Sequence, residues 1–89
     1  MKAFITVMGH DTVGVVAKVS GLCSQLNINI EDVTQSILQG MFAMIMLVDL
    51  TDCTLPFDQL SQLLKDKGME RGLDIHVQRQ DIFEAMHRI

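Results

Sequence analysis

Apolar and polar residues alternate along four segments of the chain and recur at helical spacing along two others. Period-two alternation predicts strands over residues 2–8, 28–38, 41–50 and 73–78. Apolar residues three or four apart predict a helix over residues 13–26, which we expect Thr12 to cap. A second helix is predicted to enter at Pro56 and to end at Gly68. Its expected buried stripe is Phe57, Leu60, Leu63 and Leu64.

The predicted order of elements is βαββαβ, with Gln39-Gly40 as a two-residue hairpin turn between the second and third strands. This order is typical of an α+β, ferredoxin-like sandwich, in which a four-stranded antiparallel sheet carries two helices on one face. A short C-terminal helix is expected between Asp81 and Ile89, where Asp81 and Glu84 have capping-box spacing. The apolar residues expected to share one stripe of this tail are Ile82, Phe83, Met86 and Ile89.

The first and third strands, at the centre of such a sheet, are apolar on both sides. Two helices cover only one face, so the other face would carry apolar surface suited to a second subunit. The composition agrees, since 48% of the residues are hydrophobic and 20% are charged. We therefore expect a single domain, residues 1–89, that forms a homodimer. Met41, Met44 and Met46 are expected in the core and at the dimer face.

Charge and cysteine spacing exclude several classes of function. A net charge of −4 without basic clusters argues against nucleic acid and anionic membranes as partners. No apolar run is long enough to span a membrane, and Met1-Lys2 leads directly into a strand, so a cytoplasmic protein is expected. Cys23 and Cys53 lack metal-site or redox spacing and are expected to be buried. No metal or cofactor is predicted.

The turn after the first strand carries the most distinctive chemistry. It contains Gly9, Asp11 and Gly14 in the pattern G-x-D-x-x-G-V. Backbone amides at a helix start attract anions, and glycines let a ligand approach the main chain closely. The pattern therefore indicates binding of a small molecule.

This turn, the Leu26-Asn27-Ile28-Asn29-Ile30 segment that opens the second strand, and the βαββαβ order together resemble the ACT domain, a small regulatory module that binds amino acids. The tail Phe83-Glu84-Ala85-Met86 resembles that of stand-alone ACT proteins of the glycine cleavage system regulator type (UPF0237-like). The resemblance implies a ligand at a subunit interface, beside the loop. It implicates Gly9, Asp11, Gly14, Val15 and Asn29 as ligand-binding residues.

On this view, amides near Val15 hold the ligand's carboxylate, while Asp11 and the Asn29 carbonyl receive its ammonium. Each residue also has a structural alternative. Asp11 can satisfy amides of the turn, Gly14 can permit close packing of helix on sheet, and Asn29 can brace a loop or occupy an edge strand or bulge. The chain has Val13 where the family commonly has proline, so its helix start is less rigidly preset.

The function expected from these observations is that of a dimeric, non-catalytic module that binds an amino acid or similar small ligand and modulates a separate enzyme or regulator protein. One alternative is a ligand-free dimerisation or scaffold module. Another is a small acylphosphatase-like hydrolase, which needs an arginine in its first loop, where this chain has none. His10, His76 and His87 are expected to be exposed rather than to act as ligands or catalysts.

Overall fold

The computed structural model describes residues 1–10 and 14–86. Its elements follow one another as β1 (Lys2–Gly9), α1 (Val15–Gln25), β2 (Asn29–Leu38), β3 (Met41–Asp49), α2 (Phe57–Met69), β4 (Asp74–Arg79) and α3 (Gln80–Met86). The strands form one antiparallel sheet in the order β2-β3-β1-β4. The predicted ferredoxin-like α+β fold is therefore confirmed.

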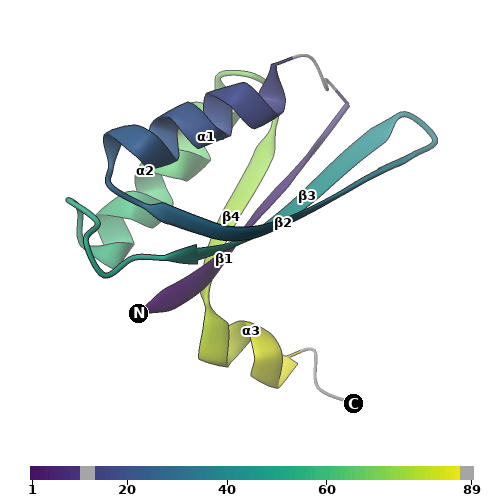
Figure 1. Ribbon diagram of the computed structural model, residues 1–89. Helices are drawn as coiled ribbons and strands as arrows, with labels where there is room; N and C mark the ends of the chain where they lie inside the picture. The colour runs from purple at the N-terminus through teal and green to yellow at the C-terminus, as the bar shows by residue number, and fades with distance from the viewer. Residues whose placement is uncertain (11–13, 87–89) are drawn as a thin grey trace.

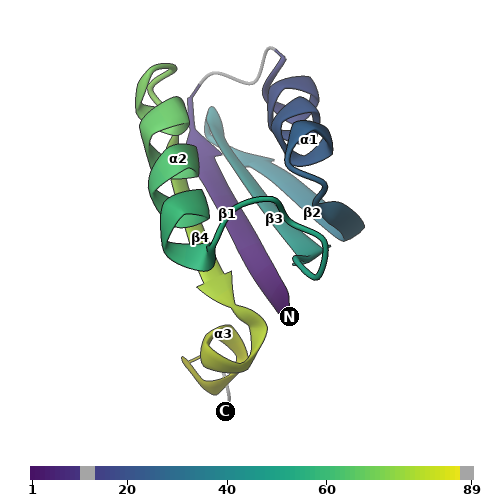
Figure 2. The same cartoon turned by 90° about the vertical axis from the view of Figure 1, so that its left-hand side faces the viewer.

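Helices α1 and α2 lie side by side over one face of the sheet, which we call the closed face (Figure 1). Helix α1 lies over the β2 side of the sheet and α2 over the β4 side (Figure 2). Helix α3 follows the C-terminal end of β4 and lies near the N-terminus of the chain. The other face, which we call the open face, carries neither α1 nor α2. The sheet thus has one covered and one largely uncovered side.

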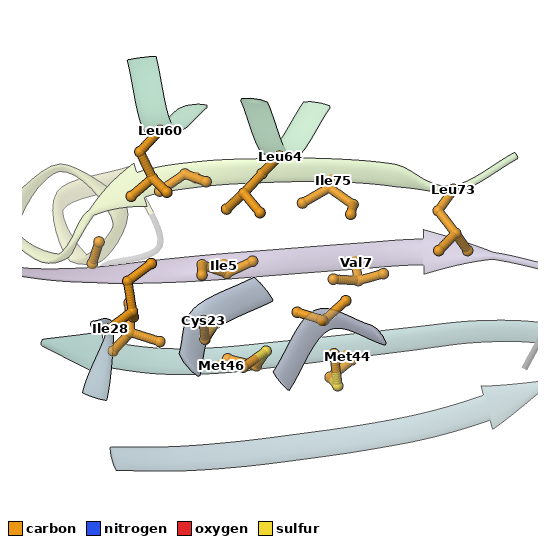
Figure 3. Close-up of a cluster of buried hydrophobic side chains, with 14 of the residues drawn as sticks. Ile5, Val7, Cys23, Ile28, Met44, Met46, Leu60, Leu64, Leu73 and Ile75 are labelled. Carbon is orange, nitrogen blue, oxygen red and sulfur yellow. The ribbon is translucent and has the colours of Figure 1, made fainter. Parts of the chain in front are cut away.

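The core lies between the closed face and the two covering helices (Figure 3). Ile5 and Val7 of β1 are fully buried there against Leu60 and Leu64 of α2, and Cys23 of α1 joins them. Met44 and Met46 are only 1% exposed, which confirms their predicted place in the core. Burial of these side chains supplies the main driving force for the fold.

The open face consists of the alternate residues of the central strands. Thr6 and Met8 of β1 lie opposite Ile45 and Ala43 of β3, and Ile45 remains 39% exposed. Helix α3 contributes Phe83, whose ring centroid lies 4.4 Å from that of Phe4 on β1. The C-terminal helix therefore packs on its own chain, at the end of the open face near the N-terminus.

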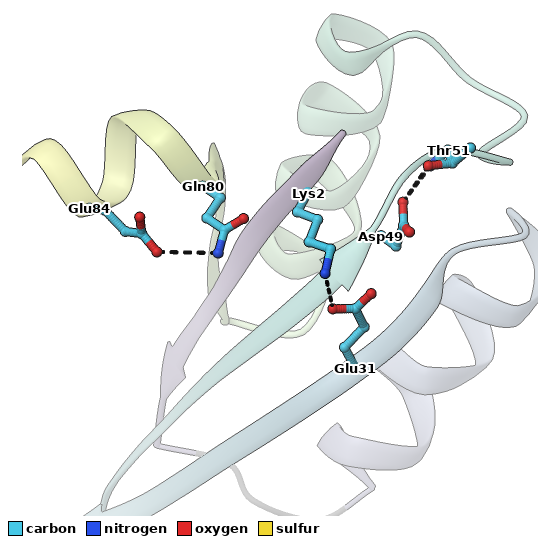
Figure 4. Close-up of polar contacts among 6 residues, drawn as sticks. All are labelled: Lys2, Glu31, Asp49, Thr51, Gln80 and Glu84. Carbon is cyan, nitrogen blue, oxygen red and sulfur yellow. Dashed lines mark hydrogen bonds and ion pairs between the residues drawn. The ribbon is translucent and has the colours of Figure 1, made fainter.

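The predicted stripe of α3 is wrong in part, because Ile82 and Met86 are exposed. The predicted capping box is also wrong, since α3 begins at Gln80 and the Glu84 carboxylate accepts a hydrogen bond of 3.2 Å from the Gln80 side chain (Figure 4). Asp81 instead pairs with Arg79 at 2.9 Å. Ile89 lies outside the described residues.

Helix α1 begins later than the sequence predicts. Its N-cap is Gly14 rather than Thr12, which lies outside the described residues together with Val13. At the other end, the Ile28 amide donates to the Cys23 carbonyl at 2.8 Å and the Asn27 amide to Ser24 at 3.3 Å. With Asn27 at a positive φ of 57°, this is a Schellman motif, which turns the chain into β2.

Gly68 does not end α2, so that prediction is wrong. The helix runs on to Met69, and Gly72, with φ of 70°, occupies the left-handed position of a second Schellman motif, in which the Leu73 amide donates to the Gly68 carbonyl at 2.8 Å. Position 68 lies inside the helix, and it requires glycine because β4 approaches the helix closely there. A Cβ there would come 2.8 Å from Ile75 and 2.9 Å from the Leu73 carbonyl oxygen.

The β2–β3 hairpin agrees with the sequence. Gln39 and Gly40 have positive φ values of 52° and 79°, as a two-residue turn of the primed type requires. The strand pairing shifts between Ile30 and Asp32, so β2 is an edge strand with a bulge near its start. Both features tolerate Asn29, the first residue of β2.

Candidate functional site

Gly9 is the last residue of β1 and is buried. A Cβ at this position would come 2.6 Å from the Leu73 side chain and 3.4 Å from the Gly72 carbonyl oxygen. Glycine is therefore required by the close approach of the turn between α2 and β4. His10, the next residue, is exposed, as predicted.

Gly14 takes a backbone conformation that other residues rarely adopt, with φ of 71°. The alternative that glycine is needed for close packing is wrong, because a Cβ here would meet no atom of the described residues within 4 Å. The left-handed backbone turns the chain into α1, and the Gly14 carbonyl accepts the Lys18 amide at 2.9 Å. Gly14 thus sets the direction in which α1 starts.

The start of α1 has the character of an anion site. The side chain of Val15 is 2% exposed and lies in the core, so this residue offers a ligand only its backbone N–H. Within the described residues, no side chain caps the helix, and its first turn holds no acidic residue. The amides of this turn and the positive end of the helix dipole therefore suit an external carboxylate. Asp11, the predicted partner of the ligand's ammonium, lies outside the described residues.

Asn29 is exposed at the start of β2, beside a polar surface hollow of about 710 Å³. The residues that line this hollow are Ser24, Asn27, Ile28, Asn29 and Asp52. Asn27 and Asp52 were not expected there. A left-handed asparagine after an amphipathic helix is a recognisable signal for Asn27, but no sequence pattern connects Asp52 to β2.

Asn29 and the Gly9–Gly14 turn lie at opposite ends of the sheet. Asn29 pairs with Asp49, and Asp49 pairs in turn with Lys2 at the start of β1. Gly9, at the other end of β1, pairs with Phe42. Since a strand rises about 3.3 Å per residue, roughly 20 Å separates the two ends. One chain therefore does not bring Asn29 to the turn.

Several polar side chains contact one another near the Asn29 end of the sheet (Figure 4). The Lys2 ammonium lies 2.8 Å from the Glu31 carboxylate, and this hydrogen bond and charge raise the pKa of Lys2. Hydrogen bonds from the hydroxyl and amide of Thr51 lower the pKa of Asp49. All of these groups are solvent-accessible, so the pairs define a hydrated, polar end rather than a catalytic pocket.

Groups suited to catalysis or metal binding are scattered in the described part of the chain. His76 pairs with Asp74 at 2.8 Å, but both side chains are well exposed. Burial raises the pKa of the Cys23 thiol to about 11, which opposes formation of a thiolate nucleophile. Residues 1–10 and 14–86 contain no group of three or more histidine, cysteine or acidic side chains placed to hold a metal ion. His87 lies outside them.

Comparison with known proteins defines the class. A family model described as the ACT domain matches residues 2–78, and the chain belongs to the ACT domain family. Within that family it is similar to the UPF0237 proteins. One from Listeria innocua is 47% identical over 89 residues, covering all of both chains. Another, from Methanopyrus kandleri, is 42% identical over 88 residues, covering 99% of this chain and 98% of that protein.

Solved structures agree with this assignment. An ACT domain protein from Streptococcus pneumoniae superimposes with a TM-score of 0.84 at 38% identity, covering 94% of each chain. A protein described as a glycine cleavage system transcriptional repressor gives a TM-score of 0.73 at 23% identity, covering 89% of this chain but 45% of that one. The second likeness shows the shared fold. None of the helices in the described residues is long and apolar enough to cross a membrane.

Proposed function

We propose that this protein is a cytoplasmic, non-catalytic regulatory module that binds an amino acid between two copies of the chain and modulates a separate enzyme or regulator protein. The Gly9–Gly14 turn of one copy, with Asp11 and the Val15 amide, forms one half of the site. Asn29 of the other copy forms the second half. The observation that carries this proposal is the strand register. It places Gly9 and Asn29 at opposite ends of the sheet within one chain, so only a second copy can bring the two halves together.

A two-fold arrangement of β2 strands would join these halves. β2 is an edge strand, and antiparallel pairing with a second β2 sets the Asn29 end of one copy beside the Leu38 end of the other. The Leu38 end is also the Gly9 end of the sheet, because Ile37 pairs with Phe42 and Phe42 with Gly9. Asn29 of one copy would therefore approach the turn of its partner.

Exposed apolar side chains on this edge support the same arrangement. Val33 and Ile37 of β2 pair with residues of the closed face, yet they remain 39% and 65% exposed. Val16 is 39% exposed on the first turn of α1, the helix that lies over the β2 side of the sheet. A second copy along β2 would cover these three side chains, a gain of about 25 cal/mol for each Å² of apolar surface removed from water.

A regulatory role agrees with the kind of protein that shares the fold, since one similar structure is described as a transcriptional repressor of the glycine cleavage system. Membership of the ACT domain family points the same way. Binding of a ligand across two copies would change how they sit relative to each other, and a partner protein would respond to that change.

The first experiment is a thermal-shift screen of the twenty amino acids. At least one of them should raise the Tm by a few degrees, because a ligand that binds only the folded dimer stabilises it by mass action. Asp11→Ala and Asn29→Ala should each remove this shift. Asp81→Ala, which changes an exposed carboxylate on α3, should leave it intact.

A mixture of the two variants tests whether the site spans two copies. A dimer of one Asp11→Ala chain and one Asn29→Ala chain has one site with both changes and one intact site. Random mixing should therefore restore about a quarter of the wild-type sites. A variant with both changes in each chain should restore none when it is unfolded and refolded in the same way. Failure of the mixture to recover binding would overturn the shared site.

The second candidate function is a ligand-free scaffold, and the exposed apolar residues Met8 and Ile45 of the open face favour it. Such a scaffold would dimerise but show no thermal shift with any amino acid at millimolar concentration. The shift thus separates the two functions, while light scattering tests the dimer that both require.

A further inference from the structure

A second hollow lies at the Gly9 end of the sheet and is lined by residues of β1, β3 and β4 and by the end of α2 with the turn that follows it. Its volume is about 480 Å³, within the range of about 300–1,000 Å³ that small-molecule sites occupy. The lining residues are Met8, Gly9, Met41, Met69, Gly72, Leu73 and Asp74. In Figure 2 this region is the junction between the end of β1 and the turn that follows α2, at the end of the molecule remote from α3.

The walls are three methionines from three different elements. Met8 of β1 is 41% exposed, Met69 of α2 is 68% exposed, and Met41 of β3 is half-buried. These side chains differ from Met44 and Met46, which are fully buried in the core. Unbranched thioether side chains adapt to apolar surfaces of varied shape. The hollow is therefore suited to an apolar ligand body.

The floor is backbone, held in place by two glycines. Gly72 has a positive φ that completes the Schellman motif after α2. Gly9 lets that turn approach β1, because a Cβ would come 3.4 Å from the Gly72 carbonyl oxygen and 2.6 Å from the Leu73 side chain. The shape of the hollow thus follows from packing that the fold already requires, so a ligand would meet a preformed surface.

Among the described residues that line the hollow, the one charged side chain is the acidic Asp74. The Asp74 carboxylate is exposed and lies 2.8 Å from Nε2 of His76, a contact that leaves further lone pairs for a ligand. Met69 is the last residue of α2, so the negative end of that helix dipole also lies at the hollow. Both features favour a cation and disfavour a carboxylate.

We propose that this hollow is a second ligand site, which takes a small primary amine with an apolar body. The body lies against Met8, Met41 and Met69, and the ammonium pairs with Asp74. The ligand class differs from the zwitterionic amino acid proposed for the other site, because the described residues of this lining include no basic side chain to pair with a carboxylate.

The experiment uses the full chain with carbon-13 in its methionine methyl groups and follows their NMR signals. The probes are 2-phenylethylamine, the matched acid 3-phenylpropionate, and ethylamine, which lacks the apolar body. We expect 2-phenylethylamine to shift the signals of Met8, Met41 and Met69 with saturation in the millimolar range. The other two probes should bind about tenfold more weakly. Met86, equally exposed on α3, should not shift and controls for adhesion to any apolar surface.

Two variants test the contacts. Asp74→Asn should weaken the amine by about fivefold, the size expected for an exposed ion pair, whereas Asp81→Asn at the far end should not. Met69→Gln should weaken it too, whereas Met86→Gln should not.

Three results would overturn the proposal. The first is equal binding of the amine and the acid, and the second is a shift of Met86 as large as that of Met69. The third is a shift of the three signals with protein concentration in the absence of any probe, which would show that a second copy of the chain covers the hollow.

Discussion

The two faces of the sheet carry similar apolar side chains but bury them to different extents. On the closed face, Ile5 is fully buried beneath the helices, whereas Ile45 on the open face is 39% exposed although its strand is equally central. Apolar residues therefore do not by themselves reveal which face is covered. The closed face stabilises the monomer, and the open face remains available for contacts beyond the single chain.

The same substitution on each face tests most directly whether the two faces contribute differently to stability. Ile5→Ala should lower the free energy of unfolding by about 2–5 kcal/mol, because it leaves a cavity in a close-packed core. Ile45→Ala should cost less than about 1 kcal/mol, since much of that side chain is already in water. Urea denaturation monitored by circular dichroism measures both values. Equal losses would show that the open face is buried in solution.

Strand alternation predicted which residues share one side of the sheet, because successive side chains along a strand point to opposite faces. Ile75 and Val77 of β4 are buried while Asp74 and His76 are exposed, as the alternation requires. The patterns failed where distant elements meet. The role of Gly68 depends on the approach of β4, and this approach has no local signature along α2.

The two candidate sites show both outcomes. Gly14 and Asn29 stand out in the sequence as a turn glycine and a strand asparagine. In the structure Gly14 has a positive φ, and Asn29 begins an edge strand beside a bulge. Their separation at opposite ends of the sheet already follows from the predicted order of elements, because α1 runs back along the sheet from the end of β1 to the start of β2. The hollow beside Met69 has no such local signal, because it depends on packing between β1 and the turn after α2.

Alkaline pH tests the core between the closed face and the helices, because Cys23 is buried there. Burial raises the pKa of this thiol from 9.0 to about 11, so between these values the folded protein keeps a proton that the unfolded chain releases. Stability should therefore fall as the pH rises through this window, by up to about 1.4 kcal/mol per pH unit.

Urea denaturation between pH 8 and pH 10.5 tests this sign, with Cys23→Ala as the comparison. The variant is expected to be less stable at pH 8, because it lacks a buried side chain, but to lose less stability as the pH rises. A parallel decline in both proteins would contradict the assignment to Cys23.

Two helical glycines, Gly68 of α2 and Gly21 of α1, differ in what surrounds them. Gly68→Ala should destabilise the protein by about 1–3 kcal/mol, because the new methyl group would meet Ile75 of β4 and the backbone carbonyl of Leu73, the residue before β4. Gly21→Ala should instead stabilise it by about 0.5–1 kcal/mol. Gly21 is exposed on α1, and within the described residues no atom lies within 4 Å of its added Cβ.

Thermal and urea unfolding of the two variants should therefore move in opposite directions from the wild type. The intrinsic helix preference of alanine is the same at both positions, so the difference between them isolates the contact of α2 with β4. Stabilisation by Gly68→Ala would mean that α2 stands further from the sheet than its hydrogen bond to Leu73 indicates. Destabilisation by Gly21→Ala would mean that a partner, such as a second copy of the chain, packs closely on the outer side of α1.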